Sequence, residues 1–184
     1  MVLGAAGGLG LAAVQIARLL GAQVIATAST ADKREAARTA GAHHCVDSSA
    51  ADWTEQLKVL TDGNGADVIV DPVGGDGFER VFRRLAWGGR YLVMGFAGGS
   101  IPNLATNLAL LKGAALMGVD ICQFALREPE KAAASREQLA QWVDAGALQP
   151  NAGITYGLND FRSALASTFS RQRIGKTIVN LQQE

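Results

Sequence analysis

The stretch GAAGGLG, residues 4–10, decides the fold class of this chain. Val2 and Leu3 before it resemble a strand end, and residues 8–20 carry apolar side chains at helical spacing. Glycines between a strand and a helix permit a tight turn and let the main chain approach a pyrophosphate at the helix N-terminus. The stretch therefore predicts a dinucleotide-binding turn. Its G-x-x-G-x-x-G spacing departs from the usual G-x-G-x-x-G, so a turn built only for packing remains the alternative.

Apolar runs and amphipathic segments alternate along the rest of the chain. We expect strands at 23–28, 43–47, 66–71, 91–96 and 115–120, and helices at 31–40, 52–60, 78–86 and 129–145. A short extended piece at 153–156, a helix at 160–169 and a strand at 176–181 should follow. Short connections between alternating strands and helices predict a doubly wound parallel sheet, α/β in class, with helices on both faces. No linker divides the chain.

The composition excludes several classes of protein. The chain has 184 residues, of which 48% are hydrophobic, and its 17 basic side chains balance 17 acidic ones. This profile indicates a globular core, and zero net charge argues against a nucleic-acid partner. The most apolar stretch, 104–119, is shorter than the roughly 20 residues that span a membrane. We therefore expect no membrane association and, because no leader peptide is recognisable, a cytoplasmic location.

The residues after the second expected strand bear on which cofactor is bound. NAD-preferring sites commonly place an acid there, whereas this chain has Ser29 and Thr30, followed by Asp32, Lys33 and Arg34. Small hydroxyl residues followed by two cations suit an additional 2′-phosphate, so NADP(H) is predicted over NAD(H). The alternative is that the two cations form the solvated face of a helix whose N-cap is the aspartate.

Three segments, 4–30, 71–99 and 173–179, together resemble the cofactor domain of zinc-independent medium-chain dehydrogenases. The GFAGGSIPN sequence at 95–103 resembles the quinone oxidoreductase-like branch of that family. The resemblance covers essentially the whole chain and implies a Rossmann-like NADP-binding domain over residues 1–184.

In the family, a GroES-like barrel precedes this domain, and the segment corresponding to 151–184 packs against the barrel. That barrel is absent here, so the chain resembles an excised domain, a truncated product or a start-site error. Because the family's substrate pocket lies between the two domains, no catalytic residue is assigned.

The resemblance also implies the residues that contact the cofactor. By position, the pyrophosphate would be cradled by Gly7, Gly8, Leu9 and Gly10, and the 2′-phosphate would face Ser29, Thr30 and Lys33, beside the Arg34 that the charge pattern adds. The nicotinamide-side ribose would be lined by Asp71, Val73 and Gly74, the nicotinamide would lie near Gly95, Phe96 and Ala97, and Arg171 would reach back to the cofactor. One departure is Ser48, where many members have a tyrosine that touches the cofactor phosphate.

The activity implied by the resemblance is hydride transfer from NADPH to a quinone or enone without a metal. His43, His44 and Cys45 are adjacent strand residues whose side chains alternate between faces, so they should not converge on a metal ion. Two other functions stay open. One is a non-catalytic nucleotide-binding or oligomerisation module, and the other is an enoyl-thioester or alkenal reductase of the same architecture.

A few side chains allow two interpretations. Asp71 could act as an acid or base or cap a turn, although ribose binding is favoured. Phe96 could stack on a ring or belong to the core. Arg80, Arg83 and Arg84 lie at helical spacing and are expected to face solvent without a ligand. The expected edge strand at 115–120 suggests a homodimer, as in the family.

Overall fold

The main sheet is parallel, and its strand order reverses at the N-terminal segment. The computed structural model describes residues 1–181. On one side, β1 (Ile25–Ala28) pairs with β2 (His44–Asp47), and on the other β3 (Ala66–Asp71) pairs with β4 (Leu85–Val93), which pairs with β5 (Ala115–Gly118). Val2 joins the halves through parallel bridges to Ala26 and Val70. The strand β3 therefore has a neighbour on each side, Val2 and β4.

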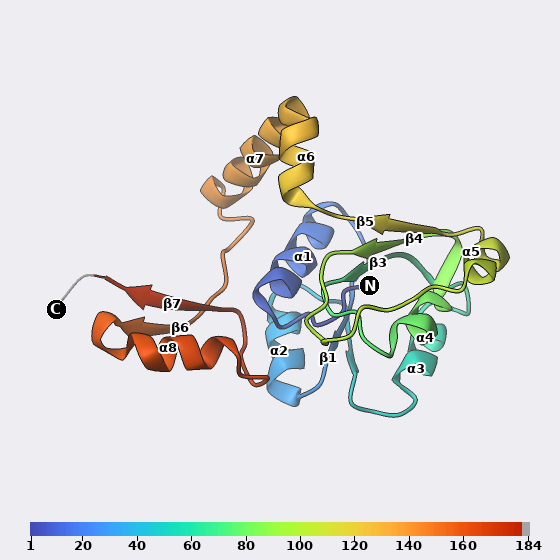
Figure 1. Ribbon diagram of the computed structural model, residues 1–184, viewed down its shortest axis with the longest axis horizontal. Coiled ribbons are helices and arrows are strands. Elements are labelled where there is room, and N and C mark those ends of the chain that lie inside the picture. Colours follow the sequence, from blue (N-terminus) through green and yellow to red (C-terminus); the bar gives the residue numbers. More distant parts are fainter. Residues whose placement is uncertain (182–184) are drawn as a thin grey trace.

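Two hydrophobic clusters, one on each face of this sheet, confirm the doubly wound architecture. Figure 1 shows α1 (Gly8–Leu19) and α2 (Ala31–Thr39) on one side of the strands, and α3 (Trp53–Leu60) and α4 (Phe78–Phe82) on the other. Successive strand residues point to opposite faces, so Val2 belongs to one cluster and Leu3 to the other. The clusters therefore form two layers of core separated by one sheet.

The two layers differ in side-chain size. The cluster under α1 and α2 is built largely of small residues, namely Val2, Ala5, Val14, Val24, Ala26, Ala37 and Ala42. The opposite cluster contains the aromatic residues Trp53, Phe78, Phe82 and Tyr91 among its buried members. Small side chains in this cluster allow α1 and α2 to lie close to the sheet.

Several expected boundaries need correction. The helix expected at 78–86 ends at Phe82, because Leu85 and Ala86 already belong to β4. Two helices were not expected, α5 (Thr106–Lys112) and α6 (Ile121–Arg127). The N-cap of α2 is Thr30 rather than Asp32, since Thr30 Oγ1 accepts the backbone N–H of Lys33 over 3.4 Å.

The C-terminal part forms a separate small layer. After α7 (Pro129–Asp144), β6 (Ala152–Gly157) pairs in parallel with β7 (Lys176–Asn180), and α8 (Phe161–Thr168) connects them after a 3-10 turn at Leu158–Asp160. Figure 1 shows both this unit and the α6–α7 pair projecting from the main sheet. Residues 182–184, the end of the predicted 151–184 segment, lie outside the described residues.

The C-terminal unit is joined to the glycine-rich turn. Gly175 forms a parallel bridge with Gly7, and its N–H donates to the carbonyl oxygen of Ala6 over 2.9 Å. Two segments far apart in the sequence thus meet at the start of α1. Across residues 1–181, no helix combines the length and the apolar character that a membrane crossing requires.

Candidate cofactor site

A cavity of about 580 Å³ opens at the carboxyl ends of β1 and β3. This edge, beside the point where strand order reverses, is where open α/β sheets bind ligands. Of the predicted site residues, the cavity is lined by Gly7, Gly8, Leu9, Gly10, Ser29, Lys33, Val73, Gly74 and Ala97. The structure therefore places residues from all three predicted groups, those for the pyrophosphate, the 2′-phosphate and the nicotinamide side, around one cavity.

The glycine-rich turn forms one wall, and its close contacts explain its composition. Gly4 has φ +55°, and a Cβ there would lie 2.8 Å from Val73 Cγ2. A Cβ on Gly10 would lie 2.4 Å from the carbonyl oxygen of Gly4. Helix α1 starts after Gly7 with no side-chain cap and no acid in its first turn. Its first N–H groups are therefore free to face an anion, and the cradle fits a pyrophosphate.

The charge of the cavity lining is positive. Lys33, Arg80 and Arg173 line it, and no aspartate or glutamate does so. The Nζ of Lys33 also donates to the backbone carbonyl of Arg171. A hollow lined by cations and glycine N–H groups favours a polyanionic ligand over a neutral one.

Two predicted 2′-phosphate contacts, Thr30 and Arg34, lie outside the cavity lining. Thr30 caps α2, as described above, and Arg34 Nη1 pairs with Asp47 Oδ2 at 2.9 Å and donates to the Ala28 carbonyl at 3.3 Å. Hydrogen bonds from Ser49, and secondarily the Arg34 charge, hold the pKa of the Asp47 carboxyl below its ordinary value. Arg34 is therefore paired with an ionised side chain, Asp47, which does not line the cavity.

Asp71 has a structural role. Its side chain is almost fully buried, and Oδ1 accepts the backbone N–H groups of Val73 (2.7 Å) and Gly74 (2.9 Å). Its Oδ2 accepts the Tyr91 hydroxyl at 2.6 Å. Because the carboxylate is buried and both oxygens are used, it shapes the turn after β3 and does not line the cavity. The turn-capping alternative thus fits this residue better than ribose binding.

Gly95, Phe96 and Arg171 also lie outside the lining. Phe96 is 42% exposed, so it is not a core residue, and its ring lies close over Gly74, where an added Cβ would be 3.0 Å from Phe96 Cδ1. Gly95 lies against Pro72. In place of Arg171, the cavity is lined by Arg173, two residues further on. The cofactor contacts of these three residues stay predictions.

Sequence reasoning missed part of the lining. The additional residues are Leu3, Gly4, Ala6, Thr27, Ala28, Ser48, Trp53, Pro72, Gly77, Phe78, Arg80, Val81 and Arg173. Several of them end a strand or directly follow one, as Ala28, Ser48 and Pro72 do. Their position at strand ends could have identified them from the sequence. Trp53, Phe78 and Arg80 lie on helices, and only the packing of α3 beside α4 brings them to the site.

His43 and Cys45 contact separate backbone groups. His43 Nδ1 accepts the Val24 N–H at 2.8 Å, and the Cys45 thiol donates to the Arg34 carbonyl at 3.3 Å. Burial raises the pKa of the Cys45 thiol, which favours its protonated form. Within residues 1–181, no group of three or more His, Cys, Asp or Glu side chains is arranged to hold a metal ion.

A second hollow, of about 660 Å³, contains none of the predicted residues. It lies between α1, the end of α2 and the loop after α7. Gln15 closes one side by exchanging two hydrogen bonds with the backbone of Gln149, at 2.9 and 2.8 Å. This hollow is similar in volume, but it lacks the glycine turn and the strand ends, so we place the candidate site in the first.

Comparison with known proteins gives a consistent result. The sequence pattern of the family described as zinc-binding dehydrogenase matches residues 8–139. Quinone oxidoreductase-like protein 2 from Bos taurus is 34% identical over 182 residues, covering 98% of this chain and 52% of that protein. The chain thus spans about half the length of the curated relatives it matches.

Two solved structures share the fold over almost the whole chain. The quinone oxidoreductase of Pseudomonas syringae pv. Tomato superposes with a TM-score of 0.86 at 26% identity, covering 98% of this chain and 55% of that one. The Escherichia coli quinone oxidoreductase complexed with NADPH gives 0.85 at 27% identity, covering 98% and 56%. The chain therefore belongs to the zinc-binding dehydrogenase family, as a quinone oxidoreductase-like cofactor domain.

Proposed function

We propose that this chain is the NADP(H)-binding part of an oxidoreductase that transfers a hydride to a quinone or an enone. The observation that carries the proposal is the cavity at the sheet edge, which combines a glycine cradle with Lys33, Arg80 and Arg173 and has no acidic lining residue. An acid at the end of β1 would repel a 2′-phosphate, and none is present. The similarity to a quinone oxidoreductase complexed with NADPH supports the same cofactor.

The lining residues suit distinct parts of the cofactor. Residues 7–10 and the α1 N-terminus would hold the pyrophosphate, while Ser29 and Lys33 would hold the 2′-phosphate. Val73, Gly74 and Ala97 would bound the nicotinamide end. When bound, NADPH supplies the hydride. The protein's own contribution is to bind and orient it, and the buried Asp71 helps by fixing the turn that carries Val73 and Gly74.

Cofactor preference is the first test. NADPH and NADH are titrated separately into the purified chain by calorimetry, for the wild type, Lys33→Glu and the control Lys58→Glu, an exposed lysine on α3 outside the cavity. We expect Lys33→Glu to weaken NADPH binding about 10-fold or more and NADH binding far less, because only NADPH carries the 2′-phosphate. Equal weakening of both would refute the 2′-phosphate assignment, and a wild type that binds neither would refute the proposed function.

The acceptor is the second test. NADPH oxidation is followed with a quinone, an enone, an alkenal and an enoyl thioester, using the chain and the longer protein in which it occurs, if it is a part of one. Faster turnover with the quinone or enone supports the proposal, and a preference for the alkenal or the thioester supports the reductase alternative. Tight NADPH binding without turnover on any acceptor supports a non-catalytic module.

We further propose that the chain forms a homodimer through β5. Within residues 1–181 this strand pairs only with β4, and all its residues are exposed, including Leu116 and Met117 at 44% each. An unpaired apolar edge is a surface for pairing with a second strand. Light scattering should give a dimer mass for the wild type and for Val59→Lys on α3, and a monomer mass for Leu116→Lys. A monomeric wild type at high concentration contradicts the dimer.

A further inference from the structure

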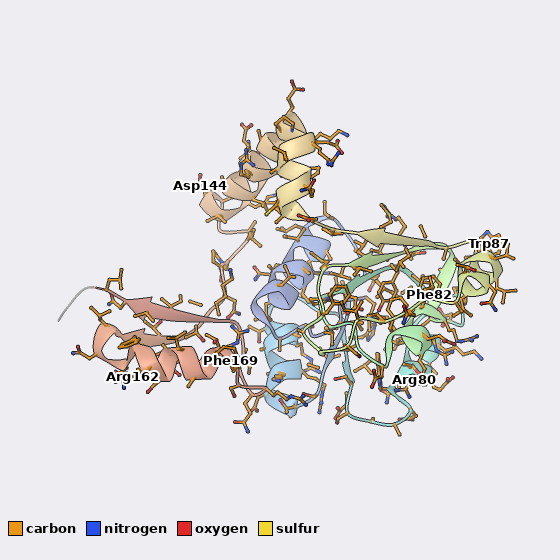
Figure 2. All side chains as sticks on the ribbon, in the orientation of Figure 1. Arg80, Phe82, Trp87, Asp144, Arg162 and Phe169 are labelled. Carbon is orange, nitrogen blue, oxygen red and sulfur yellow. The ribbon has the colours of Figure 1, made fainter. Side chains whose placement is uncertain are left out.

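Arg80 differs from the two arginines that follow it on the same stretch of chain. Arg83 pairs with Glu79 at 2.7 Å, and Arg84 pairs with Glu55. Arg80, labelled in Figure 2, forms no hydrogen bond or ion pair with any residue in 1–181, yet it lines the candidate cofactor cavity. Arg80 is exposed, as expected of all three arginines, and it differs from the other two in lining the cavity.

The wall around Arg80 differs in character from the glycine wall. It consists of Ser48 after β2, Trp53 at the start of α3, and Phe78, Arg80 and Val81 on α4, and we refer to these five residues as the base lobe. Trp53, Phe78 and Val81 are otherwise buried, with exposed fractions of 9%, 4% and 2%. The base lobe is thus a largely apolar part of the cavity wall with one guanidinium and one hydroxyl.

Such a wall suits an aromatic ring better than a phosphate. A planar guanidinium gains energy by lying over a π face, whereas a phosphate requires several converging N–H donors. Those donors gather elsewhere in the cavity, at the glycine turn, Lys33 and Arg173. The Ser48 N–H donates to the carbonyl oxygen of Ala28 over 3.2 Å, so the Ser48 end of the base lobe adjoins Ser29, a residue assigned to the 2′-phosphate. A cofactor with its 2′-phosphate at Ser29 and Lys33 would therefore have its adenine within reach of the lobe.

We propose that Arg80 recognises the adenine of the bound cofactor by placing its guanidinium against the ring within the base lobe. This inference rests on the proposed function. It makes Arg80 an affinity determinant that does not discriminate between the two nicotinamide cofactors, because NADPH and NADH carry the same base. Selectivity between them is then left to Ser29 and Lys33.

The test compares Arg80→Gln, Arg80→Lys and the matched control Arg83→Gln, titrated with NADPH and with NADH at low and high salt. We expect Arg80→Gln to weaken both cofactors about 10-fold, by the same factor within about twofold, and with little dependence on salt. Arg80→Lys should recover little, because an ammonium lacks the planar face. Arg83→Gln should bind as the wild type does. Unchanged circular dichroism of each variant shows that the fold is intact.

Three results would overturn the inference. If Arg80→Gln binds both cofactors as the wild type does, Arg80 plays no part. If the loss is confined to NADPH and shrinks with salt, or if Arg80→Lys restores binding, Arg80 acts as a phosphate contact instead. In each of these cases the wild type still binds NADPH, so the proposed function stands. A wild type that binds neither cofactor removes the proposed function and this inference together.

Discussion

Tyr91 donates its phenolic hydrogen to Oδ2 of Asp71 over 2.6 Å, in a pair buried between β3 and β4. The other oxygen of the carboxylate holds the turn that brings Val73 and Gly74 to the cavity. A single buried carboxylate therefore connects the centre of the sheet with the proposed nicotinamide end of the site. The first two predictions follow from this pair.

Replacing Tyr91 by phenylalanine should destabilise the chain by roughly 1–3 kcal/mol, because Asp71 Oδ2 would lose its hydrogen-bond donor in a buried position. The measurement is urea-induced unfolding. Tyr156→Phe on β6 makes the same chemical change at a hydroxyl with no hydrogen-bond partner in residues 1–181, so it should have little effect. Equal effects of the two variants would show that the Asp71 contact does not stabilise the fold.

Stability should fall at alkaline pH partly through Tyr91. Burial, reinforced by the hydrogen bond to Asp71, raises the pKa of the Tyr91 phenol far above its ordinary value. The unfolded chain loses this proton near pH 10, while the folded chain keeps it. The contribution of Tyr91 to the free energy of unfolding is therefore complete below about pH 10 and is lost as the pH rises further. Between about pH 9 and 11, the free energy of unfolding should fall more steeply for the wild type than for Tyr91→Phe. Parallel curves would contradict this.

Stability should also decline below neutral pH through His43. Desolvation of the ring, with the nearby charges of Arg18 and His44, lowers its pKa, and its Nδ1 must be unprotonated to accept the Val24 N–H. The stabilising contribution of neutral His43 is thus complete above its pKa in the unfolded chain, about 6.5. It is lost as the pH falls through the lower pKa that His43 has in the folded chain. His43→Asn should flatten the loss of stability between pH 7.5 and about 5.5, measured by urea unfolding. His44→Asn, which leaves His43 in place, should not flatten this loss. If His44→Asn flattens the pH dependence of stability as much as His43→Asn does, the decline below neutral pH does not come from His43.

Adding one methyl group at Gly10 should disturb both fold and site. A Cβ there would lie 2.4 Å from Gly4 O and 2.7 Å from Ala5 Cα, so α1 must move away from the turn. We expect Gly10→Ala to lower the free energy of unfolding by roughly 1–3 kcal/mol and to weaken NADPH binding. Gly118→Ala on β5, where a Cβ meets no atom within 4 Å, is the control. A Gly10→Ala variant as stable as this control would mean that the close approach is not needed.

The sequence predicts elements best where a repeating pattern is long or a stop signal is strong. The strand at 66–71 is found with the expected bounds, and α1 and α7 end within one residue of expectation. Helix α6 was missed although Asp120 caps it, with Oδ1 accepting the N–H groups of Cys122 and Gln123. The sequence pattern places Asp120 at the end of the preceding strand, because a short helix has too few turns to show its period.

At the candidate site, the sequence predicts roles that depend on neighbouring residues, but not roles that depend on contacts between distant elements. The turn at 4–10 carries its own signal, because its glycines are required by contacts within a few residues and with the following helix. The use of Asp71 depends on Tyr91, which lies on the neighbouring strand. The exposure of Arg80 to the cavity depends on the packing of two helices. No pattern along the chain reports such contacts, so these roles follow only from the fold.

The bridge between Gly7 and Gly175 has a thermodynamic consequence. Through Lys33, whose Nζ holds the Arg171 carbonyl, and through Arg173 in the cavity lining, the turn before β7 shares its contacts with the place where phosphates would bind. A ligand that binds Lys33 and Arg173 would also hold the β6–α8–β7 unit in position. By linkage, a partner of that unit that changes the ligand's affinity would have its own affinity changed by the ligand by the same factor. The cavity and the projecting unit therefore share contacts through which such a coupling would act.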